Sequence, residues 1–189
     1  MLLLCACVAC GGASTAPDDK ETKEDGLSIV ATIFPPYDFA RVVGGDAVTV
    51  TQLLPPDTEA HGYEPTLGDL SLIESCDLFL YIGGETDAWV DELLATLDGK
   101  GPRCLALIDT VSVVTEETVA GMEGEEETAA ETCPAYDEHI WTSPKNAKRM
   151  VQAITDVLCE LDAANASVYT ANSAAYGLEL DALDDALTE

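Results

Sequence analysis

The chain contains only two histidines, His61 and His139, and both stand in short polar loops that also contain proline. His61 lies within LLPPDTEAHGYEPT, and His139 lies within YDEHIWTSP. Neutral imidazole is a common protein ligand for zinc, and a pair of imidazoles suits zinc or manganese better than calcium or magnesium. Each histidine by itself is more often a surface or capping residue than a ligand. The matching contexts of the loops favour one shared divalent-cation site.

Carboxylates near these loops could add oxygen ligands to such a site, and the candidates are Glu59, Glu64 and Glu85. Glu64 belongs to a YEP turn and is better explained as a structural residue. Glu85 is either an additional metal ligand or an acid that favours the N-terminus of the following helix. Histidines and carboxylates also build catalytic metal sites, so a small metallohydrolase is an alternative. The chain has no HExxH motif, which favours binding without catalysis.

The elements that must position these residues alternate along the first part of the chain. Short apolar runs rich in β-branched residues predict strands at residues 27–34, 47–54, 77–84 and 103–109. Helical patterns fall between them, at residues 35–45, 66–76 and 87–97. This alternation predicts an α/β fold, in which a four-stranded parallel sheet is flanked by helices on both faces. Such sheets bind ligands beyond the carboxyl ends of their strands, where both histidine loops should meet.

The alternation ends at residues 115–138, a strongly acidic stretch without helical or strand period that predicts a surface loop. The remaining sequence predicts helices, so the fold should end in a long helix. Two apolar stripes mark their buried faces, one made of Ala147, Val151, Ile154, Leu158 and Leu161, the other of Tyr169, Tyr176, Leu180, Leu183 and Leu187.

Composition limits the size and the partners of the molecule. With 189 residues, of which 47% are hydrophobic, the chain is long enough for one domain with a packed core. Its 36 acidic residues against 8 basic ones give a formal net charge of -28. A surface this negative repels nucleic acid and attracts cations, although solubility alone explains most of the acidity. We therefore expect no nucleic-acid partner.

The N-terminal residues MLLLCACVAC are apolar, and GGASTAPDDKETKEDG after them is small, polar and charged. This order is typical of a secretion signal, residues 1–10, followed by a flexible tether, residues 11–26. CVACGG resembles a bacterial lipobox, with Cys10 as the lipidated cysteine and Cys7 as the alternative. The sequence thus predicts an extracytoplasmic protein that a lipid anchor holds at the cell membrane. A frayed apolar terminus is the competing interpretation.

The other cysteines are scattered singly, at Cys76, Cys104, Cys133 and Cys159, without a CxxC pair. This spacing excludes a zinc-finger site. Cys104 and Cys159 have apolar neighbours in the sequence, which predicts buried thiols. A disulfide in an exported chain remains an alternative, and spacing does not choose its partners.

Four motifs in order resemble the zinc- and manganese-binding solute-binding proteins of bacterial ABC importers: LLPPDTEAHGYEPT, YIGGETDAWV, DEHIWTSPKNA and ANASVYTANSAAYGLELDAL. The first is similar to the Pro-Gly-x-x-x-His-x-Tyr-Glu-Pro ligand loop of that family, and the third to its Asp-Pro-His-x-Trp loop. The resemblance implies that His61 and His139 bind zinc, or alternatively manganese, and that the partner is an importer permease. It also implies a lipid anchor in Gram-positive bacteria, in agreement with Cys10. Some members carry the older description of adhesins, so a metal-dependent surface adhesin is an alternative.

The chain departs from that family in three places. Glu138 stands where the third motif usually has proline, and the acidic stretch stands where members usually have a histidine-rich metal-collecting loop. The family has two lobes joined by a backbone helix. On this pattern, residues 27–164 form the N-terminal metal-binding lobe and residues 165–189 begin the backbone helix. The C-terminal lobe is expected to be absent, and the chain to be truncated.

Overall fold

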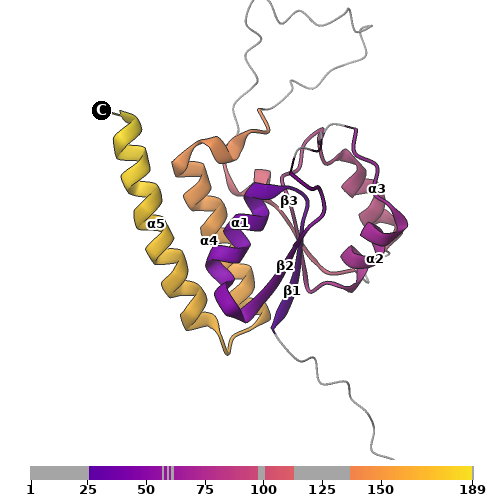
Figure 1. Cartoon of the computed structure of the whole chain (residues 1–189), viewed down its shortest axis with the longest axis horizontal. Coiled ribbons are helices and arrows are strands. Elements are labelled where there is room, and N and C mark those ends of the chain that lie inside the picture. The colour runs from indigo at the N-terminus through magenta and orange to yellow at the C-terminus, as the bar shows by residue number, and fades with distance from the viewer. Residues whose placement is uncertain are drawn as a thin grey trace, which may run out of the picture.

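Four parallel strands form the centre of the computed structural model, which describes residues 26–56, 58, 60, 62–97, 101–112 and 137–188 (Figure 1). The strands are β1 (Leu27–Ala31), β2 (Val48–Gln52), β3 (Leu78–Tyr81) and β4 (Arg103–Ala106). They lie in the order β2-β1-β3-β4, and each neighbouring pair is parallel. The predicted four-stranded parallel sheet is therefore confirmed.

Helices cover both faces of the sheet. The α-helices are α1 (Phe34–Gly44), α2 (Leu67–Ser75), α3 (Ala88–Thr96), α4 (Pro144–Leu161) and α5 (Ala166–Thr188). Three short 3-10 turns are η1 (Gly45–Ala47), η2 (Leu107–Thr110) and η3 (Ile140–Thr142). In Figure 1, α1, α4 and α5 lie on one side of the sheet, and α2 and α3 lie on the other. The fold thus ends in a long helix, as the sequence predicts.

The core forms one hydrophobic cluster on each face of the sheet. Alternate strand residues supply the two clusters, because successive side chains of a strand point to opposite faces. Ile29 and Leu80 belong to the cluster under α1, α4 and α5, whereas Val30 and Phe79 belong to the cluster under α2 and α3. All four side chains are buried, which is why β1 and β3 are continuously apolar in sequence.

The first strand ends earlier than the sequence predicts. The apolar run continues to Phe34, but β1 ends at Ala31 and Phe34 is the first residue of α1. Pro35 and Pro36 follow immediately, and proline suits the first helical turn because that turn does not need its N–H groups. The two prolines therefore start the helix inside the apolar run.

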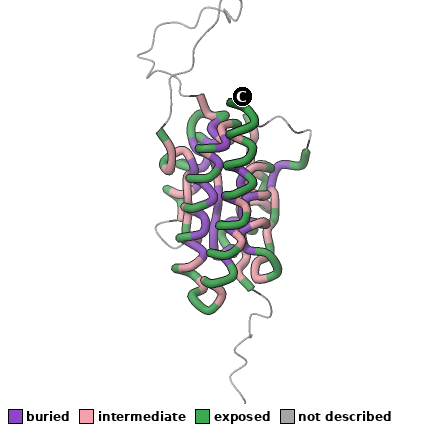
Figure 2. The backbone as a smooth tube through the Cα atoms, turned by 90° about the vertical axis from the view of Figure 1, so that its left-hand side faces the viewer, coloured by how far each residue is buried: buried purple, intermediate pink, exposed green. Residues whose placement is uncertain are grey.

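The predicted apolar stripes are only partly buried. The α4 stripe packs into the core except for Leu161, which is 40% exposed. On α5, Tyr169 and Leu180 are buried, but Leu183 and Leu187 are exposed. Figure 2 shows α5 at the surface of the molecule with exposed residues along its length. Among the described residues, no helix is long and apolar enough to cross a membrane.

The cysteine prediction was wrong in which thiols are buried. Cys76 is buried, whereas Cys104 and Cys159 are only half-buried, and all three are free thiols. Cys104 lies on β4, at one side of the sheet, and Cys159 lies near the end of α4, so their apolar neighbours do not enclose them. Burial raises the pKa of the Cys76 thiol to about 11. Cys133 lies outside the described residues.

Candidate metal-binding site

The carboxyl ends of the four strands form one rim, because all four strands run in the same direction. Backbone hydrogen bonds extend the sheet past the strands themselves. The amide of Leu53 donates to the Ala31 carbonyl at 2.9 Å, and the amide of Thr32 donates to the Leu80 carbonyl at 3.0 Å. On the other side, the amide of Ile108 donates to the Ile82 carbonyl at 2.9 Å. The loops that follow the strands therefore leave the sheet from one fixed edge.

His61 lies outside the described residues, as does Glu59, but the chain directly after it is well anchored. The Tyr63 hydroxyl donates to Asp69 Oδ2 at 2.8 Å, and the Tyr63 ring meets the Trp89 ring edge-on with the centroids 5.6 Å apart. Gly62 has a φ of 78°, a turn conformation that glycine adopts without strain. The loop that carries His61 is thus attached to α2 and α3 on its C-terminal side.

Asp69 fixes this anchor through several hydrogen bonds. Thr66 and Asp69 form a capping box at the start of α2, in which each side chain bonds the backbone N–H of the other residue. Burial alone would raise the pKa of Asp69, but hydrogen bonds from Thr66 and Tyr63 outweigh it and hold that pKa below its ordinary value. Burial and the bond to Asp69 together raise the pKa of Tyr63 to about 12. The phenol therefore stays a hydrogen-bond donor at neutral pH.

The loop between β3 and α3 turns through two glycines with positive φ, Gly83 at 93° and Gly84 at 82°. Asp87 closes this loop from inside. Its Oδ2 accepts hydrogen bonds from the amides of Ile82 at 2.8 Å and Gly83 at 3.1 Å. Burial raises the pKa of Asp87, and these two bonds offset part of the rise. The loop that carries Glu85 is consequently a fixed part of the rim.

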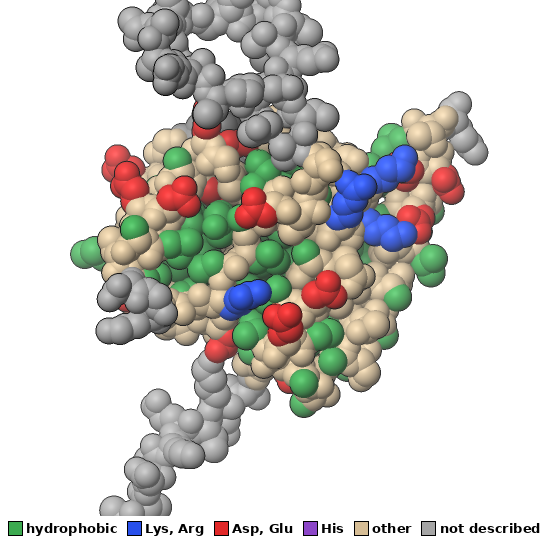
Figure 3. All heavy atoms as spheres, turned by 180° about the vertical axis from the view of Figure 1, so that it is seen from behind, with side chains coloured by type: hydrophobic (Ala, Val, Ile, Leu, Met, Phe, Trp, Pro, Cys, Tyr) green, Lys and Arg blue, Asp and Glu red, His purple; other side chains and the backbone are tan. Residues whose placement is uncertain are grey.

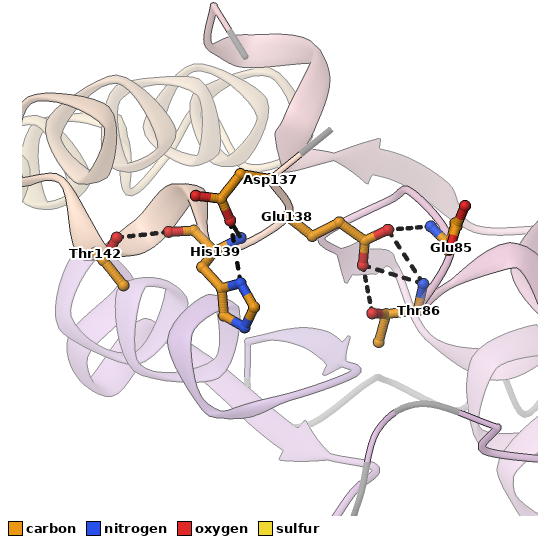
Figure 4. A network of polar contacts seen from close by, with 6 residues as sticks. All are labelled: Glu85, Thr86, Asp137, Glu138, His139 and Thr142. Atoms are coloured by element: carbon orange, nitrogen blue, oxygen red, sulfur yellow. Dashed lines mark hydrogen bonds and ion pairs between the residues drawn. The ribbon is translucent and has the colours of Figure 1, made fainter. Parts of the chain in front are cut away.

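His139 stands just before η3, with its side chain 62% exposed. Asp137 Oδ1 accepts a hydrogen bond from the His139 amide at 2.9 Å and lies 3.1 Å from the His139 Nδ1 (Figure 4). On the other side, the Thr142 hydroxyl donates to the His139 carbonyl at 2.7 Å. A carboxylate opposite Nδ1 favours the tautomer with its hydrogen on Nδ1, which leaves the lone pair of Nε2 available to a metal.

Glu138 joins the His139 segment to the β3–α3 loop. Its carboxylate accepts hydrogen bonds from the amide of Glu85 and from the amide and hydroxyl of Thr86, with the Thr86 amide 3.1 Å from Oε2 (Figure 4). In the sequence, Glu138 is only a departure from a proline-containing motif. Its partners are more than 50 residues away, so local pattern could not identify them.

Glu85 itself is exposed, and its backbone amide, not its carboxylate, contacts Glu138. Glu64 is also exposed. Within the part of the chain that the structure describes, no group of three or more His, Cys, Asp or Glu residues is arranged to hold a metal ion. Since His61 lies outside that part, its sharing of a site with His139, and the role of Glu85, remain predictions.

The surface around these elements is mainly acidic where it is charged. Figure 3 shows Asp and Glu side chains distributed over the rear face, with few Lys and Arg side chains among them. Several of the basic residues are held in ion pairs, such as Lys148 with Asp181 at 2.6 Å and Lys145 with Asp184 at 3.1 Å. The field of the molecule therefore favours the approach of cations.

Known proteins are similar to this chain in both sequence and fold. The family described as "Zinc-uptake complex component A periplasmic" matches residues 29–189. The zinc-binding lipoprotein AdcA of Streptococcus pneumoniae is 34% identical over 174 residues, which cover 90% of this chain and 34% of AdcA. The high-affinity zinc uptake system protein ZnuA of Bacillus subtilis is 31% identical over 195 residues, which cover 97% of this chain and 58% of ZnuA.

Among solved structures, the Zn(II)-bound ZnuA-like domain of Streptococcus pneumoniae AdcA superimposes with a TM-score of 0.70 at 31% sequence identity. The superposition covers 85% of this chain and 54% of that domain. The chain thus spans between about a third and somewhat over half of these relatives. Members of this family are metal-binding transport proteins. The match over residues 29–189, together with the shared fold, shows that the chain belongs to the family of zinc-uptake complex component A.

Proposed function

We propose that this protein captures zinc outside the cytoplasm as the binding component of an ABC importer and delivers it to the permease. Manganese is the alternative cargo. The observation that carries the proposal is the pairing of the His139 Nδ1 with Asp137 at 3.1 Å, on the rim of a parallel sheet. Family membership supports zinc over other cations, and the net charge of -28 supports a cationic cargo.

The capture site would be built from imidazoles held in place before the metal arrives. A carboxylate that accepts from one ring nitrogen fixes the tautomer and raises the basicity of the other, which is the usual support of a zinc-binding histidine. We assign this role to Asp137, with His139 Nε2 as the ligand and His61 as the second ligand. Glu85 is the candidate for an additional oxygen ligand. Capture and release of a cation require no covalent bond of a substrate to break. We therefore propose a binding protein without catalytic activity.

The proposal includes a location outside the cytoplasm and a lipid anchor. The family is described as periplasmic, and the AdcA relative is described as a lipoprotein. Cys10 is the proposed lipidation site and Cys7 the alternative, with residues 11–26 as the tether to the membrane. Mass spectrometry of the native chain tests this part: an acylated N-terminal cysteine supports it, and an unprocessed Met1 contradicts it.

Calorimetric titration of the 189-residue chain with zinc tests the site itself. The intact chain is expected to bind one zinc specifically, and either His61→Ala or His139→Ala should abolish that binding, because each removes a ligand that water replaces poorly. Deletion of residues 116–131 is the matched control for weak binding by acidic residues, and it should leave the specific site nearly intact. If both alanine variants bind zinc as tightly as the intact chain, the proposed function is refuted.

A further inference from the structure

The Glu138 carboxylate lies in a cradle of hydrogen-bond donors on the β3–α3 loop. Two backbone amides and one hydroxyl, from Glu85 and Thr86, donate to its two oxygens. Successive N–H groups in a turn of this kind form a concave site that suits an anion. The cradle lies just before α3, whose N-terminal end also favours negative charge. On folding, the half-buried carboxylate thus replaces its hydrogen bonds to water with hydrogen bonds to donors held in place by the loop.

Gly84 makes room for this carboxylate. A Cβ atom at position 84 would lie 2.6 Å from the Glu138 Cδ atom, so no other residue type fits beside Glu138 without a shift. The φ of Gly84, 82°, is also a conformation that other residues rarely adopt. The Glu138 side chain therefore fills the space that a side chain at position 84 would take. This fit distinguishes Glu138 from an exposed acidic residue that merely lies near the N-terminus of a helix.

The hydrogen bonds of Glu138 connect the segment that contains His139 to the β3–α3 loop. Glu138 directly precedes His139, and Thr142 bonds the His139 carbonyl on the other side at 2.7 Å. Asp137 then orients the imidazole through Nδ1. Figure 4 shows the Glu138 carboxylate and the His139 ring projecting in different directions from adjacent residues. The carboxylate is occupied by the cradle, while the imidazole is left for another partner.

We propose that Glu138 is a positioning residue that holds His139 at the sheet rim in the orientation needed to bind a divalent transition metal. It acts through His139 and is not itself a metal ligand. The inference rests on the proposed function only in taking His139 as a ligand. The fixing of the imidazole by Glu138 is a property of the metal-free chain, and it can be measured separately.

The first test uses metal-free protein and NMR of the imidazole nitrogens. With only two histidines, the His61→Ala variant assigns the His139 signals. Wild-type protein should show one tautomer, with the hydrogen on Nδ1, and Glu138→Asp should shift the signals toward the tautomer mixture of a free imidazole. Asp keeps the charge but is too short to reach the cradle. Glu74→Asp, at an exposed position near the end of α2, is the matched control. Unchanged His139 signals in Glu138→Asp would overturn the proposal whether or not zinc binds.

The second test measures zinc affinity by competition with a chromophoric chelator, using the full chain. Glu138→Asp and Glu138→Ala should each weaken zinc binding by about 10- to 100-fold, the usual effect of losing a group that supports a ligand. The loss should persist at high salt, because it arises from position and not from the field of a charge. A loss that disappears in Glu138→Asp or at high salt would overturn the positioning role. Undiminished binding by His139→Ala would instead refute the proposed function.

A third measurement tests whether the Glu138 carboxylate lies against Gly84. Gly84→Ala should weaken zinc binding in the wild-type chain, because the new methyl group displaces the Glu138 carboxylate. In the Glu138→Ala background the same substitution should cost much less, since only backbone strain remains. Such coupling is expected of residues in direct contact. Equal losses in the two backgrounds would show that the carboxylate is not seated beside Gly84, and the proposal would fail.

Discussion

At the scale of single residues, the most informative contact is that between Asp137 Oδ1 and the His139 ring. We predict that Asp137→Asn weakens zinc binding by about 10- to 100-fold without unfolding the chain, because the neutral amide is a weaker partner for Nδ1–H and holds the ring orientation less firmly. The measurement is a chelator competition at neutral pH. Asp156→Asn is the matched control. Asp156 is exposed on α4, and within the described part of the chain its side chain bonds only Gln152, at 2.8 Å. A result identical to the control would remove Asp137 from the site.

Thr32 is a second residue with an unusual position on the rim. It is fully buried, and among the described residues its hydroxyl has no hydrogen-bond partner. An unpaired buried hydroxyl costs stability, so we predict that Thr32→Val stabilises the metal-free chain by about 1 kcal/mol. Thr51→Val, at an exposed position of β2, should have little effect. Chemical denaturation measures both, and a clear loss of stability in Thr32→Val would mean that the hydroxyl has a partner.

At the scale of elements, the corner between α4 and α5 depends on one carboxylate. Asp162 Oδ2 accepts from the Asn165 side chain at 2.6 Å and from the Tyr169 hydroxyl at 2.8 Å. These bonds hold the pKa of Asp162 below its ordinary value. A lowered pKa means that the contribution to stability is present above the unfolded pKa, roughly 3.9, and is lost as the pH falls through the folded value.

We therefore predict that Tyr169→Phe lowers the melting temperature at pH 7, and that its difference from wild type shrinks as the pH falls below about 4. The reason is that wild type loses the same interaction when Asp162 is protonated. Thermal denaturation followed by circular dichroism over this pH range provides the test. Tyr37→Phe, at a half-buried tyrosine of α1, is the control. A pH-independent difference would mean that the hydroxyl acts through packing and not through Asp162.

Comparison of the predicted with the observed elements shows which features of the fold could be predicted from the sequence alone. Apolar runs and helical periods predicted the sheet and its helices because each pattern is local. They missed the end of β1 because the proline pair competes with the apolar run. Leu67 is apolar and belongs to the helical pattern at residues 66–76, but it is 86% exposed at the first position of α2. The contact of Glu138 with the β3–α3 loop depends on tertiary structure, and no period in the sequence encodes it.

At the scale of the whole molecule, charge is the dominant property. The chain has a net charge of -28 on 189 residues, so its acidic side chains repel one another in the folded state and lower its stability. We predict that raising sodium chloride from about 0.01 M to about 0.3 M increases the melting temperature, because salt screens this repulsion more than it weakens the few ion pairs. Differential scanning calorimetry measures the shift. A melting temperature that falls with salt would mean that the ion pairs outweigh the repulsion.

The strand order β2-β1-β3-β4 determines which strands a bound metal would stabilise. His61 follows β2, an outer strand, whereas Glu138 attaches the His139 segment to the loop that follows β3, an inner strand. Two strand spacings, roughly 10 Å, separate β2 from β3. A cation that binds both histidines would therefore join β2 to the interior of the sheet. Any local opening that detaches β2 or the loop after β3 would then also release the metal.

We therefore predict that zinc slows amide hydrogen exchange in β2 by the same factor as in the inner strands β1 and β3. The last turn of α5, where Leu183 and Leu187 are exposed, should exchange as fast with zinc as without it. Hydrogen exchange followed by mass spectrometry resolves these segments. Protection that excludes β2 would place the metal on His139 alone, and β2 would then open independently of the inner strands.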